Sequence, residues 1–377
     1  MKKLITFLKR ETVLAAAILL AVVSSVLVRP DMEYLGYIDY KTIGLLFSLM
    51  TVMAGFNRLG IFQRAGQWLL GRVSSPAAIA GVLVYLCFFL SMAITNDVAL
   101  ITFVPFAVTV LSMARMERLI VPVVVLQTIA ANLGSMMTPV GNPQNLYLYS
   151  RAGIPFSEFL VLMAPYTAVS FALLFVCLVF VGRYWRKSGE TTAAVEFKMQ
   201  GDGGMTPSGK LDFLIYLALF FVAMASVARV LSWQALCIAV LAAVFWRDKS
   251  LFFAVDYSLL LTFAAFFIFI GNMGRIPEFC AVLADVLEGR EVITSVAASQ
   301  VISNVPAALL LSGFSDQWEK LIVGTNLGGL GTLIASMASL ISYKAIAVRF
   351  PEKKKSYFSL FTALNLVFLA VLLVMAL

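Results

Sequence analysis

Long apolar runs divide this sequence, and most are close to the length of a helix that crosses a bilayer. Crossing the hydrocarbon core takes about 20 apolar residues. Nine runs are of this kind: residues 12–28, 41–57, 119–150, 158–182, 211–228, 233–246, 251–271, 320–343 and 356–377. Apolar residues make up 61% of the chain and charged residues 13%, against about 45–50% and 25% in soluble proteins. The sequence therefore predicts an all-α polytopic membrane protein with about nine transmembrane helices.

Composition excludes several functional classes. The chain has no histidine, and its four cysteines are scattered singly with no Cys-x-x-Cys pair, which argues against zinc sites and against Ser-His or Cys-His catalysis. We therefore expect no enzymatic activity and no cofactor. The net charge of +8 comes from basic residues scattered between apolar runs rather than gathered in a stripe with aromatics, so we expect no nucleic-acid partner.

The basic residues instead predict how the chain is oriented. The segment before the first run carries four Lys and Arg residues, but Val28-Arg29-Pro30 is a poor signal-peptidase site, so the run is interpreted as a span. A cytoplasmic N-terminus and nine crossings place 21 Lys and Arg residues inside and 7 outside. Such a bias sets orientation, so the C-terminus is expected outside. For a bacterial source the membrane would be the inner one.

Two further apolar stretches are broken near their middle and are predicted to be re-entrant hairpins. They cover residues 77–113 and 292–314, with polar breaks at Thr95-Asn96-Asp97 and Ser303-Asn304. The arms of the second are on the order of ten residues, or about 15 Å of helix, which reaches only the middle of a bilayer. The first hairpin is expected to enter from the cytoplasm and the second from outside, so that their tips meet at depth.

The same order of features occurs twice, which predicts an internal repeat. Residues 183–210 form a hydrophilic linker between an N-terminal half, 1–182, and a C-terminal half, 211–377. Each half has a span opened by Asp-Tyr, a broken hairpin, and a long span interrupted by Gly and Asn; these broken helices cover 119–150 and 320–343. The charge count gives the two copies opposite directions. Inverted repeats with interrupted helices are typical of secondary transporters, and they are not expected of a passive channel.

Asp97 is the most informative single residue of the first hairpin. It is the only acidic or basic residue between Arg72 and Arg115. A carboxylate at the bilayer centre is costly unless it is paired, hydrated or protonated. Three roles remain open: a sodium ligand, a proton carrier, or a helix N-cap. The second hairpin has Val305 at the matching position.

The four broken segments together resemble those of the ion transporter superfamily. That group includes citrate and divalent anion symporters, arsenite permeases and some sodium/proton antiporters. The string from Ile94 to Leu100, followed by Phe103-Val104-Pro105-Phe106, resembles the first hairpin of that group, and Ala131 to Asn145 resembles the broken helix after it. Ser303-Asn304-Val305-Pro306 resembles the second hairpin tip, with Val305 in place of the usual threonine.

The resemblance implies a site in which each hairpin tip and the unwound loop of its own half frame one cation, with the solute between them. The substrate-binding residues it implies are Asn96, Asn142, Pro143, Asn304, Thr325 and Asn326. The implied cation-binding residues are Thr95, Asn96, Asp97, Asn132, Gly134, Thr138, Gly141, Asn145, Ser303, Asn304, Gly329 and Thr332. No buried Arg or Lys is expected near these motifs, so helix dipoles and cations would have to neutralise an anion.

The expected function is secondary active transport of a small anion, a di- or tricarboxylate such as citrate or succinate, coupled to Na⁺ or H⁺. Arsenite or antimonite efflux is a close alternative, and a sodium/proton antiporter is a third. The expected partners are the small-molecule anion and the lipid bilayer, with a homodimer as an open alternative to a monomer. No other metal is expected at the site.

Overall fold

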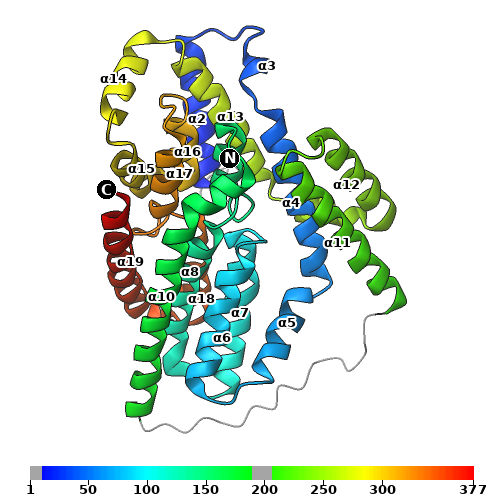
Figure 1. The fold of residues 1–377 in the computed structure, drawn as a ribbon, viewed down its shortest axis with the longest axis vertical. Helices are drawn as coiled ribbons and strands as arrows, with labels where there is room; N and C mark the ends of the chain where they lie inside the picture. The colour runs from blue at the N-terminus through cyan, green and yellow to red at the C-terminus, as the bar shows by residue number, and fades with distance from the viewer. Residues whose placement is uncertain (1–10, 189–205) are drawn as a thin grey trace.

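The computed structural model describes residues 11–188 and 206–377, and all regular structure in these two stretches is helical (Figure 1). The prediction of an all-α polytopic protein is therefore confirmed. By length and composition, five of the described helices can cross a membrane, or seven if each of two bent pairs counts as one span. The count of nine crossings stays a prediction. Most of the predicted linker, with Gly201 to Gly204, lies outside the described residues, as do the first four basic residues.

The first half begins with α2 (Thr12–Leu27) and the short α3 (Tyr34–Tyr37). A unit of seven helices then follows. Its first two, α4 (Tyr40–Arg58) and α5 (Ile61–Leu70), are bent against each other by 53°. The others are α6 (Pro76–Leu90), α7 (Asn96–Met113), α8 (Ile120–Ser135), α9 (Pro143–Ala152) and α10 (Phe156–Ser188), with the 3₁₀ turn η1 (Glu117–Leu119) before α8.

The second half begins with α11 (Pro207–Val227), α12 (Trp233–Arg247) and the 3₁₀ turn η2 (Lys249–Ala254). A second unit of seven helices follows in the same order as the first. Its first pair, α13 (Tyr257–Met273) and α14 (Pro277–Leu287), is bent by 106°. The others are α15 (Glu291–Ile302), α16 (Asn304–Leu311), α17 (Trp318–Leu327), α18 (Met337–Arg349) and α19 (Lys354–Ala376), with η3 (Pro351–Lys353) before α19.

Matching capping residues start the two units. Asp39 accepts a hydrogen bond from the Thr42 backbone N–H at 3.0 Å and begins α4, while Asp256 accepts from the Leu259 N–H at 3.1 Å and begins α13. A carboxylate that receives one of the otherwise unpaired first N–H groups is a strong helix start. The two Asp-Tyr pairs seen in the sequence are therefore equivalent helix starts.

The halves interlock rather than lie apart. Helix α2 of the first half packs along α13, and α11 and α12 of the second half pack on α4. Each half therefore supplies helices that support the first helix of the other half's seven-helix unit. In Figure 1 the hairpin α6–α7 lies in the lower part of the molecule and the hairpin α15–α16 in the upper part.

Helix length supports re-entry for the second hairpin only, because α7 of the first hairpin, with 18 residues, is long enough to cross a membrane; re-entry of the first hairpin stays a prediction. Helix α15 has 12 residues and α16 has 8, which correspond to about 18 Å and 12 Å, against about 30 Å of hydrocarbon. Their ends therefore lie inside the protein, where partners for the backbone groups at the tip must come from other segments.

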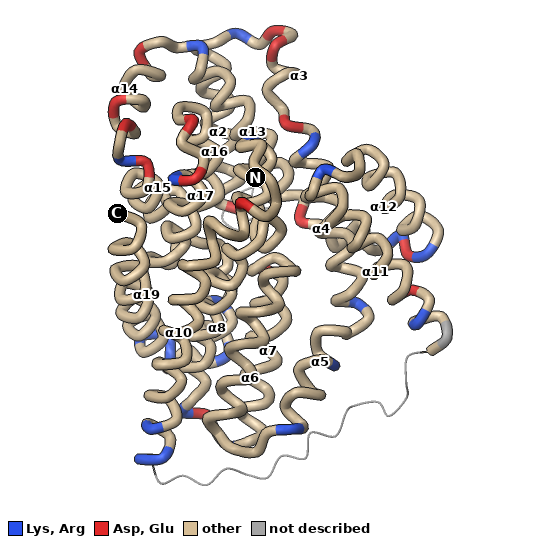
Figure 2. The backbone as a smooth tube through the Cα atoms, in the orientation of Figure 1, with Lys and Arg blue, Asp and Glu red and all other residues tan. Residues whose placement is uncertain are grey.

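Charge also differs between the two ends of the molecule. Figure 2 shows mainly Lys and Arg at the lower end, around α5 and the end of α10, whereas Asp and Glu accompany the basic residues around α3 and α14 at the upper end. Which end faces the cytoplasm stays a prediction.

Candidate functional site

Each hairpin tip is bonded to the unwound loop of its own half. The Asn96 backbone N–H donates to the Gly141 carbonyl at 3.0 Å, and the Asn304 N–H donates to the Ala335 carbonyl at 2.9 Å. These carbonyls precede the first residues of α9 and α18 in the same way. The two tips are therefore held by one shared backbone geometry.

Asn132 on α8 connects the first tip to the second half. Its Oδ1 accepts hydrogen bonds from Asn96 Nδ2 and from Ser336 Oγ, both at 3.1 Å, and its Nδ2 donates to Ser339 Oγ at 3.3 Å. All four side chains are at most 5% exposed. Because this amide uses both its donor and acceptor within the protein, it holds the two halves together at the centre of the site.

Asn326 on α17 makes the equivalent connection from the second half to the broken helix of the first half. Its Oδ1 accepts from Asn142 Nδ2 at 3.1 Å, and its Nδ2 donates to Asn145 Oδ1 at 2.6 Å and to the Ile322 carbonyl at 2.8 Å. Asn142 also caps α9 by accepting from the Asn145 N–H at 2.9 Å. Residues predicted for solute and cation from different halves thus form one buried amide network.

Two cavities lie beside this network and share a wall. The first, of about 430 Å³, is bounded by α4, η2, α13 and the start of α7, and Thr95, Asp97 and Pro143 line it. The second, of about 340 Å³, lies between α2, α7, α13, α16 and α18, and Val305 lines it. Asp97 and Asp256 line both cavities. Side chains of both tips therefore border the space that a solute could occupy.

Asp97 lies in the first turn of α7, and Thr95 is the N-cap residue, without a side-chain capping bond. The N-cap role left open by the sequence is therefore wrong. Among the described residues none forms a hydrogen bond or ion pair with the Asp97 carboxylate, which faces the two cavities instead. Its backbone N–H donates to Asn96 Oδ1 at 2.9 Å. The carboxylate is thus presented to water, ion or solute.

Asn304 differs from Asn96 in what its side chain contacts. Asn304 is 5% exposed, and its side-chain amide has no hydrogen bond with any residue in the described part of the chain. It lies close to Gly329, where a Cβ would come within 3.0 Å of its Nδ2. Its amide atoms are not among the fully enclosed side-chain atoms that lack a partner in the described chain, so they reach accessible space where a ligand can bond to them.

Other predicted site residues serve the local structure. Thr325 donates to the Leu321 carbonyl of its own helix at 2.7 Å, and Thr138 donates to the Met92 carbonyl below the first tip. Gly134 lets α8 approach α6, since a Cβ there would meet the Phe88 carbonyl at 2.0 Å. These residues shape the loops without lining either cavity.

The second tip is formed by a single residue, Ser303, with φ 74° and ψ 153°. Its hydroxyl donates to the Ala335 carbonyl at 3.4 Å. Thr332 is exposed, and its backbone N–H and hydroxyl both bond to Gln300. Gly141 contributes its carbonyl to the first tip, as described above.

Sequence reasoning missed two basic residues at the site. Arg58 lines the first cavity and pairs with Asp248, and Lys344 lines the second cavity. Both residues come from helices outside the hairpins and are exposed, so they do not contradict the expectation that no buried Arg or Lys lies near the motifs. Glu11 also lines the second cavity.

Sequence reasoning also missed three uncharged residues that bond within the site. Ser336 and Ser339 occupy the places in α18 that Asn142 and Asn145 occupy in α9, so the repeat itself could have revealed them. Gln300 precedes Asn304 by four residues and bonds to the second loop. Among the described residues no cluster of three or more His, Cys, Asp or Glu side chains could hold a metal ion.

Comparison with known proteins identifies the family. The family model described as "Citrate transporter" matches residues 4–315. The chain is similar to an inner membrane protein of Escherichia coli, with 32% identity over 317 residues that cover 81% of this chain and 80% of the relative. It is also similar to an uncharacterized transporter of Methanocaldococcus jannaschii, with 30% identity over 314 residues, 83% of each protein.

A more distant similarity covers part of the chain. A silicon efflux transporter of Oryza sativa is 28% identical over 151 residues, which are 40% of this chain and 30% of that protein.

Proposed function

The chain belongs to the citrate transporter family, and on that premise we propose that it is a secondary active transporter that moves a small anion, coupled to Na⁺ or H⁺. The observation that carries the proposal is the meeting of both hairpin tips at the two cavities. Helix α7 begins at Asn96 and α16 at Asn304, so the positive ends of two helices lie at this point. A carboxylate solute would be attracted to these ends.

Asn304 is the residue most suited to bind the solute. Its buried side-chain amide has both a donor and an acceptor to offer, and these match the oxygens of a carboxylate or hydroxyl group. Arg58 and Lys344 supply positive charge to the cavity walls. We infer that the solute rests in these cavities, against Thr95 and Pro143 in the first and beside Val305 and the adjoining Asn304 in the second, with Asn96, Asn142 and Asn326 holding the surrounding wall.

The transported solute would move when one body of the protein shifts against the other. In this proposal the hairpins and broken helices move as one rigid body, because the buried amides join them across the two halves. Helices α4, α11 and α12 belong to the other, because they pack together on the far side of the first cavity. Alternating exposure of the cavities would follow from such a movement.

The membrane setting is proposed from charge and from a relative. The Lys- and Arg-rich lower end in Figure 2 would face the cytoplasm, which leaves the C-terminus outside. A bacterial inner membrane is supported by the similarity to the Escherichia coli relative, which is described as an inner membrane protein. A homodimer is the proposed assembly to be tested alongside transport.

Uptake into proteoliposomes tests the function directly. Labelled citrate and succinate are offered to the purified chain under an imposed Na⁺ gradient, an imposed proton gradient, or neither. Accumulation that follows one gradient is expected and would identify the coupling ion. If neither acid moves under any gradient while the protein remains folded, a carboxylate is not the solute.

A neutral oxyacid is a second candidate solute, for two reasons. Three acidic residues line the cavities, Glu11, Asp97 and Asp256, against two basic ones, which favours a solute without several negative charges. The similarity to a silicon efflux transporter points the same way. The same vesicles, loaded with silicic acid or arsenite, would show proton-driven efflux if this candidate is right.

A further inference from the structure

A third cavity, of about 930 Å³, lies away from the candidate site, where η1, α8, α10 and the first half of α19 meet. Helix α8 is buried at every residue except Pro122 and forms the floor of this cavity. Helices α10 and α19 form its walls, and the hydroxyl groups of Thr128 and Tyr357, 3.2 Å apart, join the floor to α19. Phe180 and Ala363 line the cavity and are exposed, so it is a groove that opens on the outer surface of the bundle.

The lining of this groove changes from charged to apolar along its length. Arg118 and Lys353 lie at one end, the mouth of the groove, and Ser356 and Ser359 follow one and two turns farther along α19. The chain advances eleven residues from Lys353 to Leu364, or about 16 Å of helix, against the roughly 15 Å of hydrocarbon in one leaflet. The apolar part is formed by Leu126, Cys177, Val181, Leu360 and Leu364. The groove therefore has the polarity and the depth of one lipid leaflet.

The mouth lies where all three membrane-crossing helices reach a polar end, and it is strongly basic. The surrounding segments 115–118, 183–187 and 349–355 hold nine Lys and Arg residues against Glu117 and Glu352. Figure 2 shows Lys and Arg gathered at this end of α10. Helices α8 and α19 also begin here, so the positive ends of two helix dipoles lie at the mouth. The mouth therefore attracts an anion.

Hydrogen-bond donors are available at the mouth as well. Lys353 Nζ donates to the Glu117 carbonyl at 2.9 Å, and its other two N–H groups have no acceptor in the described part of the chain. The Thr128 hydroxyl donates to a carbonyl of its own helix at 2.7 Å, as is usual in a span. The hydroxyl groups of Ser356 and Ser359 form no such bond with any described residue, and both side chains are exposed. An oxyanion at the mouth can accept from all three side chains.

We infer that this groove binds one anionic glycerophospholipid from the leaflet at the Lys- and Arg-rich end of the molecule. The phosphate group lies against Arg118 and Lys353, near the Ser356 hydroxyl, and one acyl chain lies along the apolar part over Leu126. A second copy of the chain fits the groove less well, because a two-fold interface would bring two basic mouths together. The inference does not depend on the proposed transport function.

The first measurement is the thermal midpoint of the purified full-length chain in an uncharged detergent, titrated with phosphatidylglycerol or with phosphatidylcholine of the same acyl chains. Phosphatidylglycerol should raise the midpoint to a plateau and phosphatidylcholine should not, because the chains are the same and only the first lipid has a net negative charge. Glycerol 3-phosphate, which has no acyl chains, should have no effect at the same concentrations. Equal shifts with both lipids, or a shift with glycerol 3-phosphate, would overturn the inference.

A double variant at the mouth tests the phosphate contacts. Arg118→Gln with Lys353→Gln should raise the phosphatidylglycerol concentration needed for half of the shift by on the order of tenfold. Arg64→Gln with Arg72→Gln is the matched control, because it removes the same charge from the same end, around α5 and outside the groove. The control should titrate like the wild type. If both double variants weaken the lipid effect equally, the attraction is diffuse and the groove is not a site.

A third variant tests the acyl-chain part without a change of charge. Ala363→Trp should fill the groove and abolish the shift with phosphatidylglycerol, whereas Leu366→Trp, at an exposed position of the same helix outside the groove, should keep it. A full shift in Ala363→Trp would refute the inference. Gel filtration of the same proteins gives a further check: a wild-type dimer that Ala363→Trp converts to a monomer would show that a second copy fills the groove, and the inference would fail.

Discussion

The two hairpin tips share a backbone geometry and differ in chemistry. At the first tip, Asn96 is used within the protein by its bond to Asn132, and the charged Asp97 faces the cavities. At the second, Asn304 has a side-chain amide without a partner in the described chain, and the apolar Val305 stands in place of the carboxylate. The repeat thus preserves the backbone frame while the two tips differ in chemistry: a carboxylate at the first, and an amide without a partner in the described chain beside an apolar residue at the second.

The largest effect should come from removing the charge of the first tip. In Asp97→Asn, uptake against a concentration gradient should fall to the level of protein-free liposomes, because no other tip residue can carry the coupling charge. Exchange of labelled for unlabelled solute, measured by counterflow, should persist because the cavity is unchanged in shape.

Val305→Asn, at the equivalent position of the second tip, is the matched control and should keep accumulation. If Asp97→Asn still accumulates solute, the carboxylate of the first tip is not required for coupling.

A second pair of variants separates the two asparagines. Asn304→Ala should raise the KM about tenfold, as expected for one lost hydrogen bond to the solute, with little change in thermal stability. Asn96→Ala should instead lower stability by about 0.5–1.5 kcal/mol, because Asn132 Oδ1 loses one of its two hydrogen bonds and keeps only the one from Ser336. Transport kinetics and thermal unfolding of both variants check the contrast. Equal effects on both readouts would mean that the tips are not specialised.

A third comparison concerns the backbone of the tips. Ser303 has φ 74° and ψ 153°, a region that only glycine adopts readily, whereas Thr95 has φ −64°. Ser303→Gly should therefore raise stability by about 1 kcal/mol, and Thr95→Gly should lower it by a similar amount, because glycine loses more entropy on folding. Chemical unfolding of both variants measures the difference. A loss of stability in Ser303→Gly would show that its hydroxyl bond to Ala335 outweighs the strain.

Much of the fold follows from sequence, because apolar length and polar interruption act locally. The run 41–57, the breaks at Thr95 and Ser303, and the interrupted span 119–150 all have counterparts in the structure. The residues that surround the site were harder to predict. Arg58 and Gln300 bond to segments outside their own helices, and Lys344 lines a cavity built by five helices; no local pattern distinguishes these residues from other polar residues.

The likeness between the repeats hid a difference as well. Gly141 and Ala335 make the same backbone bond, yet the loop beside each is closed by Asn145 in one copy and by Gln300 in the other. Aligning the copies predicts the shared frame. It cannot predict that the amide donor to the loop comes from a different helix in each copy, since that depends on which side chain is long enough to reach the loop.

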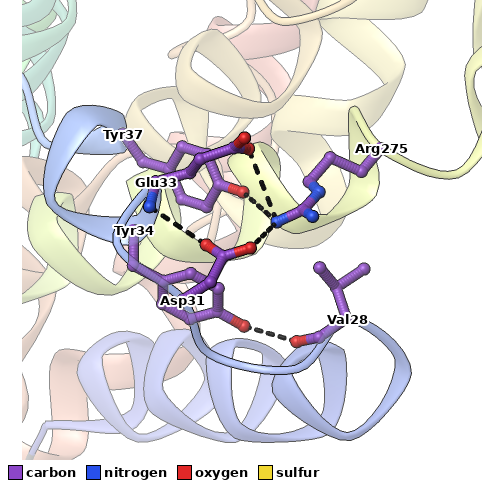
Figure 3. A network of polar contacts seen from close by, with 6 residues as sticks. All are labelled: Val28, Asp31, Glu33, Tyr34, Tyr37 and Arg275. Carbon is purple, nitrogen blue, oxygen red and sulfur yellow. Dashed lines mark hydrogen bonds and ion pairs between the residues drawn. The ribbon is translucent and has the colours of Figure 1, made fainter.

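The smallest effect is expected at the two helix bends. At each bend an arginine forms an ion pair with an aspartate of the opposite half. Arg58 at the end of α4 pairs with Asp248 of the second half, and Arg275 between α13 and α14 pairs with Asp31 of the first half at 2.6 Å. Figure 3 shows Arg275 reaching Asp31, Glu33 and Tyr37 together. The two links mirror each other, but both are partly exposed to solvent, where ion pairs contribute little.

Lowering the pH should remove the stability that the ion pair between Arg275 and Asp31 contributes. The hydrogen bond from Arg275 holds the pKa of Asp31 below its ordinary value. A carboxyl with a lowered folded-state pKa adds stability that is fully present above its unfolded pKa of about 4 and is lost as pH falls through the lower value. Arg275→Ala should therefore lower the thermal midpoint slightly at neutral pH. Its midpoint should converge with that of the wild type in acid.

Glu33→Gln is the matched control for that experiment, because Glu33 is more exposed and lies farther from Arg275, at 3.5 Å. It should change the midpoint less than Arg275→Ala at neutral pH. Asp31→Asn combined with Arg275→Ala should be no worse than either alone, since both remove the same bond. Additive losses, or a deficit in Arg275→Ala that persists at low pH, would show that Arg275 stabilises the bend through Tyr37 and not through the carboxylate.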